Sequence, residues 1–229
     1  MRPCASVRAA TGWPRRLSGA TVILGFSVFT AVAAAASLVV KVTNPDGRPV
    51  AGAVVLLHGP PGSKSAEPAE FVVDQVNQMF KPDLAVIPVR STVKFPNSDK
   101  VSHQVYSFSS AKRFQLPLYR GMPYAPISFE HPGIVTLGCN IHDDMIAYLV
   151  VTDAGWSGRT ADDGSSTVSN LPTGDFRVEV WHPRMREPTV LVERSLKLEA
   201  AGSGKLEVKL TRPLRPEPLG QKPRSWGEY

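Results

Sequence analysis

Gly138-Cys139-Asn140-Ile141-His142-Asp143-Asp144-Met145 is the most informative stretch of this sequence. It places a thiol, an imidazole and a thioether at intervals of three residues. All three side chains are metal ligands, and the soft sulfur donors favour copper over magnesium or calcium. We expect one strand to close at Cys139, a tight loop to carry His142, and a second strand to open at Met145. This arrangement would bring three ligands to one point.

A second histidine completes the candidate ligand set. His103 lies 36 residues before Cys139, in Phe95-Pro96-Asn97-Ser98-Asp99-Lys100-Val101-Ser102-His103-Gln104-Val105, near the start of an expected strand. Two histidines, one cysteine and a weak axial methionine form the ligand set of a mononuclear blue-copper electron-transfer site. The sequence therefore predicts one copper ion per chain, bound by His103, Cys139, His142 and Met145.

Other interpretations of these residues stay open at this point. An isolated cysteine is most often a small buried hydrophobic residue, so Cys139 could simply pack in a core. Met145 could likewise be a core residue at the start of a strand. Zinc fits less well, because structural zinc sites commonly use four nitrogen or thiolate ligands and methionine is a poor zinc ligand.

The first residues have the pattern of a secretory signal peptide. Four arginines, and no acidic residue, precede an apolar run over residues 20–36, which ends in the small residues Ala33 to Ser37. A basic start, a short apolar core and a small-residue end are typical of a Sec-type signal. The alternative is an uncleaved anchor, although a membrane span needs about 20 apolar residues. We expect a periplasmic or secreted protein with no membrane span after cleavage.

Removal of residues 1–36 changes the charge and cysteine content. Lys and Arg together fall from 26 to 22 against 20 Asp and Glu, so the net charge falls from +6 to +2. We therefore predict no nucleic-acid partner, since a dense basic stripe is missing. Cys4 leaves with the leader, which excludes an internal disulfide. A single cysteine in an oxidising compartment indicates an intermolecular bridge, a reactive thiol or a metal-bound thiolate.

The rest of the chain alternates short apolar segments with turn residues. Many short strands with regular Gly, Pro, Asn and Asp signals favour a sandwich or barrel. Gly59 to Glu70 has the composition of a loop, and residues 212–229 contain too little apolar surface to fold alone. Strands are expected over residues 38–42, 53–57, 134–137, 146–151, 176–181 and 206–210.

The stretch from about Pro82 to Val151 resembles the cupredoxins, the family of plastocyanin, azurin and amicyanin. The resemblance rests on three patterns: Phe95-x-Asn97-x-Asp99-x3-His103-x-Val105, Phe129-x2-Pro132-Gly133-x-Val135, and Cys139-x2-His142-x2-Met145-x3-Leu149-x-Val151. The short gap before Met145 matches the ligand loop of amicyanin. The stretch is most similar to exported cupredoxin-like proteins that are often labelled methylamine utilization proteins.

This resemblance implies an all-β fold, with a Greek-key sandwich or barrel around a type 1 copper site. It implies that His103, Cys139, His142 and Met145 bind the metal, while Asn97 and Gln104 support them from outside. Cupredoxins commonly carry Asn just after the first histidine ligand, where this chain has Gln104. Asp143 and Asp144 stand where relatives often have Pro or an aromatic residue, and their charge would favour Cu(II).

The flanking segments resemble a different module, the carboxypeptidase-regulatory, transthyretin-like β-sandwich. Residues 38–57 carry a Pro-Asp-Gly turn, and residues 160–183 carry Asp-Asp-Gly and Leu-Pro-Thr-Gly. We infer that the cupredoxin stretch is inserted in this sandwich or shares a core with it. The predicted divisions are a signal peptide over 1–36, the transthyretin-like sandwich over 37–69 and 154–211, the cupredoxin domain over 70–153, and a Pro-rich disordered tail over 212–229.

These features predict a protein that carries single electrons between redox partners, such as a c-type cytochrome, a dehydrogenase or an oxidase. Two alternatives use the same residues: a copper carrier or storage module, and a structural β-sandwich with a vestigial site. We do not expect an enzyme, because five histidines leave none for a trinuclear copper cluster. His58, His131 and His182 are expected to be ordinary surface or turn residues.

Overall fold

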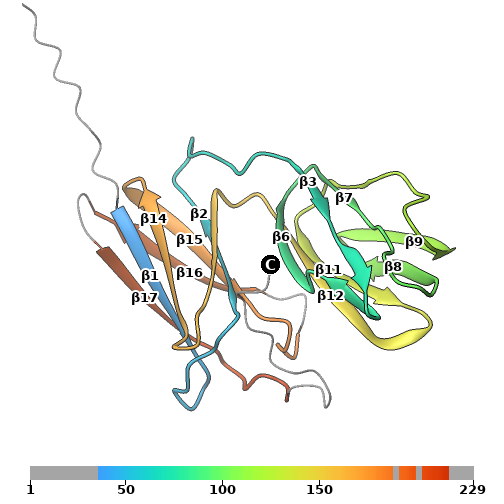
Figure 1. Cartoon of the computed structure of the whole chain (residues 1–229). Helices are drawn as coiled ribbons and strands as arrows, with labels where there is room; N and C mark the ends of the chain where they lie inside the picture. Colours follow the sequence, from blue (N-terminus) through green and yellow to red (C-terminus); the bar gives the residue numbers. More distant parts are fainter. Residues whose placement is uncertain (1–35, 188–190, 200–202, 217–229) are drawn as a thin grey trace, which may run out of the picture. The chain divides into compact units, whose positions relative to one another are not determined.

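The structure, a computed structural model, describes residues 36–187, 191–199 and 203–216 (Figure 1). Strands, turns and loops make up these residues, and there is no helix among them. The described part of the chain accordingly contains no helix with the length and apolar character needed to cross a membrane. The expectation of an all-β fold is confirmed. All of the predicted signal peptide except Ala36, which opens a strand, and most of the predicted Pro-rich tail lie outside the described residues.

One three-stranded sheet is built around the first strand. Its order is β14-β1-β17, with bounds Ser165–Leu171, Ala36–Thr43 and Ser203–Lys209. β1 pairs antiparallel with β14 and parallel with β17. Leu38, Val40 and Val42 alternate along β1 and are fully buried, as the period of a half-buried strand requires.

A four-stranded antiparallel sheet shares its core with this sheet. Its order is β13-β2-β15-β16, with bounds Trp156–Arg159, Val54–His58, Gly174–Trp181 and Val192–Leu198. The strands of both sheets contribute to one apolar cluster, in which Trp181 is fully buried. Leu84, Ile134 and Val150 belong to the same cluster, although they lie on strands of the next sheet. The rings of Tyr148 and Trp181 meet there, 5.3 Å apart.

A five-stranded sheet carries the central part of the chain (Figure 1). Its order is β6-β12-β11-β8-β9, with bounds Leu84–Pro88, His142–Thr152, Gly133–Cys139, His103–Ser109 and Lys112–Tyr119. β6 runs parallel to β12, and the other neighbours are antiparallel. β9 is an edge strand, where Pro117 is tolerated because no ladder bond is lost.

Two small sheets complete the fold and face a second apolar cluster. They have the orders β10-β7-β3 and β4-β5, with bounds Ile127–Phe129, Ser91–Lys94, Glu70–Val72, Asp74–Val76 and Met79–Lys81. The second cluster contains Phe80, Phe129 and Leu137 together with Cys139 and Met145. The candidate metal ligands therefore lie at the border of a dry core.

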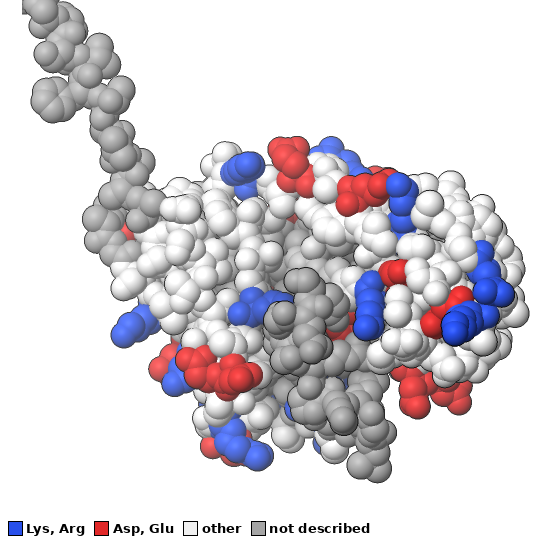
Figure 2. All heavy atoms as spheres, viewed as in Figure 1, with Lys and Arg blue, Asp and Glu red and all other residues white. Residues whose placement is uncertain are grey.

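The predicted strands all occur, and the loop from Gly59 ends where β3 begins at Glu70. The prediction for His182 is wrong. This histidine lies just after β15 and is buried, because Trp181 and the segment after it pack into the first cluster. The proposed domain divisions stay predictions. Basic and acidic side chains are interspersed on the face drawn in Figure 2, in keeping with the small net charge expected for the mature chain.

Candidate metal centre

The β11–β12 hairpin brings Cys139 and His142 together. Cys139 is the last residue of β11 and pairs directly with His142, the first residue of β12, across the two-residue turn Asn140-Ile141. Directly opposed residues of an antiparallel pair point to the same face of the sheet. The strand thus begins at His142, three residues earlier than the sequence predicted, and the ligand loop is a hairpin turn.

A bulge in β12 follows this turn. Cys139 pairs with His142, but Gly138 pairs with Ile146, so the residues from Asp143 to Met145 are extra on the β12 side. A bulge of this kind re-aims side chains. Asp143 and Asp144 are exposed, whereas Met145 returns to the core. His142 and Met145 can both face Cys139's side of the sheet only because the bulge breaks the strict alternation.

His103 reaches the same place from the neighbouring strand. β8 lies beside β11, with Tyr106 opposite Gly138, and His103 is the first residue of β8. His103, Val105 and Ser107 alternate inward and are fully buried. The period of two thus puts His103 on the core face that also holds Cys139.

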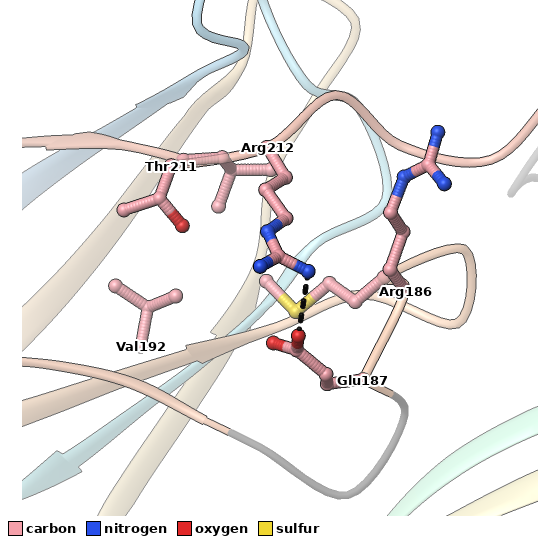
Figure 3. Close-up of a pocket in the computed structure, with 7 residues that line it drawn as sticks. Arg186, Glu187, Val192, Thr211 and Arg212 are labelled. Carbon is pink, nitrogen blue, oxygen red and sulfur yellow. Dashed lines mark hydrogen bonds and ion pairs between the residues drawn. The ribbon is translucent and has the colours of Figure 1, made fainter.

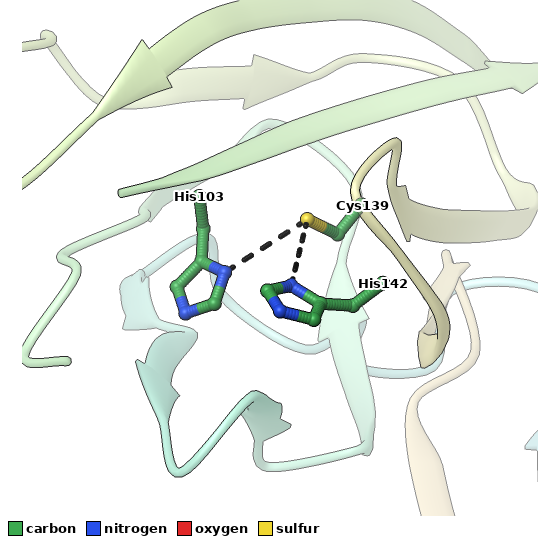
Figure 4. Close-up of side chains that lie close together, drawn as sticks. All are labelled: His103, Cys139 and His142. Atoms are coloured by element: carbon green, nitrogen blue, oxygen red, sulfur yellow. Dashed lines mark hydrogen bonds between the residues drawn. The ribbon is translucent and has the colours of Figure 1, made fainter. Parts of the chain in front are cut away.

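The three side chains converge in the close-up of Figure 4. Cys139 Sγ lies 3.9 Å from His103 Nδ1 and 4.0 Å from His142 Nδ1. Their ligand atoms all lie within 4.8 Å of one another. Metal bonds of about 2.0 Å to nitrogen and 2.3 Å to sulfur, arranged trigonally, place the nitrogen and sulfur atoms about 3.7 Å apart. The two sulfur–nitrogen distances are therefore close to those expected around one shared metal ion.

The donor set suits copper. Two imidazoles and one thiolate in a trigonal arrangement, with space for a weak axial thioether, are typical of type 1 copper. Met145 is buried in the same apolar cluster as Cys139, so its position is compatible with either an axial ligand or a core residue. Its axial role stays a prediction.

Asp99 fixes the ring of His103. Its Oδ2 lies 2.7 Å from His103 Nε2, on the side of the ring away from Cys139. The Asp99 oxygens also accept hydrogen bonds from the backbone N–H groups of Asn77 and Gln78, at 2.6 and 2.8 Å. Burial raises the pKa of the Asp99 carboxyl, but the hydrogen bonds from Gln78, His103 and Asn77 outweigh it and hold that pKa below its ordinary value.

An ionised Asp99 decides which nitrogen of His103 carries the proton. A carboxylate only accepts hydrogen bonds, so Nε2 must donate, and in the neutral ring Nδ1 then carries the lone pair. That lone pair is directed at the Cys139 side, where the metal would lie. A histidine ligand whose other nitrogen donates to a carboxylate is the usual arrangement at protein metal sites.

The two supporting residues that the sequence predicted have different places. Asn97 organises the loop before His103: its Nδ2 donates to the carbonyls of Val101 and Tyr119, and its Oδ1 accepts from the Asp99 N–H. Its support of the site is thus indirect, through Asp99. Gln104 is buried but follows His103 along β8, so its side chain alternates to the other face. A supporting role for Gln104 stays a prediction.

Sequence reasoning did not single out Asp99 as the partner of His103, nor the Asn77-Gln78 turn. The signal available for Asp99 was an acid four residues before a histidine, which many loops contain. No local pattern connects residue 78 with residue 99, because their contact depends on how the β4–β5 hairpin packs.

Large apolar side chains are exposed on the segments that carry the site. Ile141, between Cys139 and His142, is 50% exposed. Val101, whose carbonyl accepts from Asn97, is 45% exposed, and Met122 follows Gly121, which pairs with Asn97. His142 itself is partly exposed. Contiguous exposed apolar groups often mark a surface for another protein, so these side chains are candidates for such a contact.

A pocket elsewhere offers no comparable chemistry (Figure 3). Arg212 pairs with Glu187 at 2.9 Å across it. Its lining contains no histidine or cysteine: Met185, Arg186, Glu187, Val192, Leu210, Thr211 and Arg212.

Comparisons with known proteins found similarity to parts of solved structures. No family model matches the chain, and no curated protein matches it. One similar solved structure is the copper-containing nitrite reductase of Thermus scotoductus, which is 25% identical in sequence. The match covers 48% of this chain and 28% of the reductase chain, with a TM-score of 0.35. Another is a purple cupredoxin of Nitrosopumilus maritimus, which is 23% identical. That match covers 37% of this chain and 99% of the cupredoxin, with a TM-score of 0.32.

A variant of amicyanin is also similar, with 20% sequence identity. The match covers 43% of this chain and 98% of the amicyanin chain, with a TM-score of 0.33. This chain spans less than a third of the nitrite reductase chain, so that protein's reaction is not transferred to it. All three TM-scores are low, and the fold class therefore rests on the strands and their pairing. The copper chemistry rests on the side chains of the site.

Proposed function

We propose that the chain binds one copper ion through His103, Cys139 and His142, with Met145 as a weak axial ligand, and carries single electrons between redox proteins. The convergence of a buried thiol and two imidazoles, 3.9 and 4.0 Å from the sulfur, carries this proposal. When bound, copper would supply a one-electron couple between Cu(I) and Cu(II). Cupredoxins are among the solved structures to which part of the chain is similar, but the proposal rests on the side chains of the site.

The residues of the chain would hold that couple in one geometry. Asp99 fixes the His103 ring, and the hairpin pairing fixes Cys139 against His142. Burial of His103 and Cys139 excludes water from the thiolate. A site that does not rearrange between oxidation states exchanges electrons quickly. The partly exposed His142 would be the exit, and the apolar side chains of Ile141 and Val101 would meet the redox partner.

We also propose that the protein is exported and acts in the periplasm or outside the cell, as the leader predicts. In this proposal it catalyses no reaction of its own, and its partner is a cytochrome, dehydrogenase or oxidase. A role in methylamine metabolism, and a transthyretin-like module formed by the flanking strands, are further proposals that rest on sequence resemblance.

The visible absorption of the protein with one equivalent of Cu(II) tests this function. We expect an intense thiolate-to-copper band in the wild-type protein and none in Cys139→Ser. His142→Ala should weaken or shift the band, whereas His131→Ala, which removes an exposed histidine elsewhere, should leave it unchanged. Bound copper without the band would favour a carrier, and no binding would leave a structural β-sandwich.

A further inference from the structure

The turn between β4 and β5 has a strained backbone. Asn77 and Gln78 are its two central residues, and both lie in the left-handed region, with φ of 53° and 58°. Two left-handed residues define a type I′ hairpin turn, which Asn tolerates and for which Gly is the usual second residue. Glycine adopts this left-handed conformation freely, whereas the side chain of Gln78 makes it costly. Backbone strain of this kind clusters at functional sites.

This strained turn binds a carboxylate. The N–H groups of Asn77 and Gln78 donate to the two oxygens of Asp99, at 2.6 and 2.8 Å. Hydrogen bonds to an ionised acceptor are roughly twice as strong as neutral ones. The turn thus offers two aligned donors to one acid, which lies 21 residues further along the chain.

Further contacts fix the hairpin against the same loop. Asp74, at the start of β4, accepts hydrogen bonds from the backbone N–H and the hydroxyl of Ser98, at 3.2 and 2.7 Å. Gln75 is fully buried, and its side-chain amide donates to Pro96 and to the hydroxyl of Tyr119. Tyr119 in turn pairs with His103. The hairpin therefore holds both the loop and the acid that precede the first histidine ligand.

We propose that the Asn77-Gln78 turn is a positioning element for the metal centre: it holds the Asp99 carboxylate against Nε2 of His103, so that Nδ1 stays directed at Cys139. This inference rests on the proposed function and assigns a part in it to a hairpin that lies before the cupredoxin-like stretch. Asn77 and Gln78 are exposed, and their backbone hydrogen bonds go to Asp99, so the turn acts on the site through that carboxylate.

Two substitutions of Gln78 test whether the turn positions Asp99 or only supports the fold. Gln78→Gly keeps the N–H donor and relieves the left-handed strain, so it should leave the site unchanged and raise stability. Gln78→Val keeps the same N–H but resists a positive φ, so it should loosen the turn and release Asp99. Asp99→Asn is the direct test, because its amide nitrogen must face a donor N–H of the turn whichever way the side chain is rotated.

The first measurement is ¹⁵N NMR of the histidine rings in metal-free protein. We expect His103 to be protonated at Nε2 in the wild type and in Gln78→Gly, and to populate the Nδ1-protonated form in Gln78→Val and Asp99→Asn. The second measurement is Co(II) affinity, which should fall 10–100-fold in Asp99→Asn, as is usual when the partner of a ligand histidine is removed. Asp163→Asn, an exposed acid that bonds Ser165 in another turn, is the control.

Either measurement can overturn the proposal. If folded Gln78→Val and Asp99→Asn keep the wild-type ring protonation, the turn and Asp99 are only structural. If Gln78→Val lowers stability but changes neither ring protonation nor affinity, the turn supports the fold and not the site. The ring protonation is read without metal, so it decides this inference even if copper binding, and with it the proposed function, fails.

Discussion

The ring of Tyr106 lies directly over Gly138, the residue before Cys139. The two residues are paired across β8 and β11, and a Cβ added at Gly138 would lie 2.8 Å from Cζ and 2.9 Å from Oη of Tyr106. Tyr106 also packs against the exposed ring of Phe108, with centroids 5.1 Å apart. A side chain at the neighbour of the candidate thiolate would therefore have to displace the end of the Tyr106 ring.

Gly138→Ala should destabilise the protein by about 1–3 kcal/mol, the usual cost of inserting atoms into a packed site. In an open strand the same change would be favourable, because alanine restricts the unfolded chain. Urea unfolding measures the difference. Combination with Tyr106→Thr should recover most of the loss, and simple additivity of the two effects would argue against the contact.

Met145→Leu distinguishes an axial ligand from a core residue. The change conserves volume, so the metal-free protein should lose less than about 1.5 kcal/mol. If Met145 is an axial ligand, its loss should change the visible spectrum of the copper form and raise its potential. Identical spectra and potentials for the two proteins would assign Met145 to the core alone.

His182 should make stability depend on pH. Burial, assisted by the charges of Arg184 and Arg159, lowers the pKa of His182 from 6.5 to about 4. The folded protein therefore keeps this ring neutral while the unfolded chain takes up a proton. The contribution of the neutral His182 ring to the free energy of unfolding is fully present above pH 6.5. It is lost as the pH falls toward 4, by up to about 3 kcal/mol.

Unfolding of metal-free protein at several pH values between 4 and 7.5 measures this slope. His182→Asn retains an acceptor for the backbone N–H of Arg184, which bonds Nδ1 at 3.1 Å. The variant should have a flatter profile over this range. An unchanged profile would mean that another group titrates there.

The hydroxyl of Thr160 links two buried backbone groups. It accepts from the N–H of Ala53 at 2.8 Å and donates to the carbonyl of Val50 at 2.6 Å. Thr160→Val would leave both groups without this partner, at about 1–3 kcal/mol each. Thr160→Ser keeps the hydroxyl and should cost only about 1 kcal/mol for the lost methyl group. Thermal unfolding of the two variants should differ clearly; equal losses would assign the effect to packing.

Local patterns were sufficient for some of the strands and for part of the site. Alternation along residues 38–42 predicted β1 because one face of a strand is buried and its period is fixed by the backbone. Cys139 and His142 were predicted together because only two residues separate them, and a turn of that length has few conformations. The copper-type donor set follows from residue identity alone.

Contacts between distant segments required the tertiary structure. The sequence showed Asp99 and His103 four residues apart, but only packing of the β4–β5 hairpin turns the Asp99 carboxylate toward Nε2. The bulge that returns Met145 to the core, the ring of Tyr106 over Gly138 and the burial of His182 have the same origin. The sequence by itself determined which candidate ligands are present and how they are spaced, since both depend only on neighbours along the chain. Their orientation was decided by tertiary contacts, because side chains far apart in sequence compete for the same space and the same hydrogen bonds.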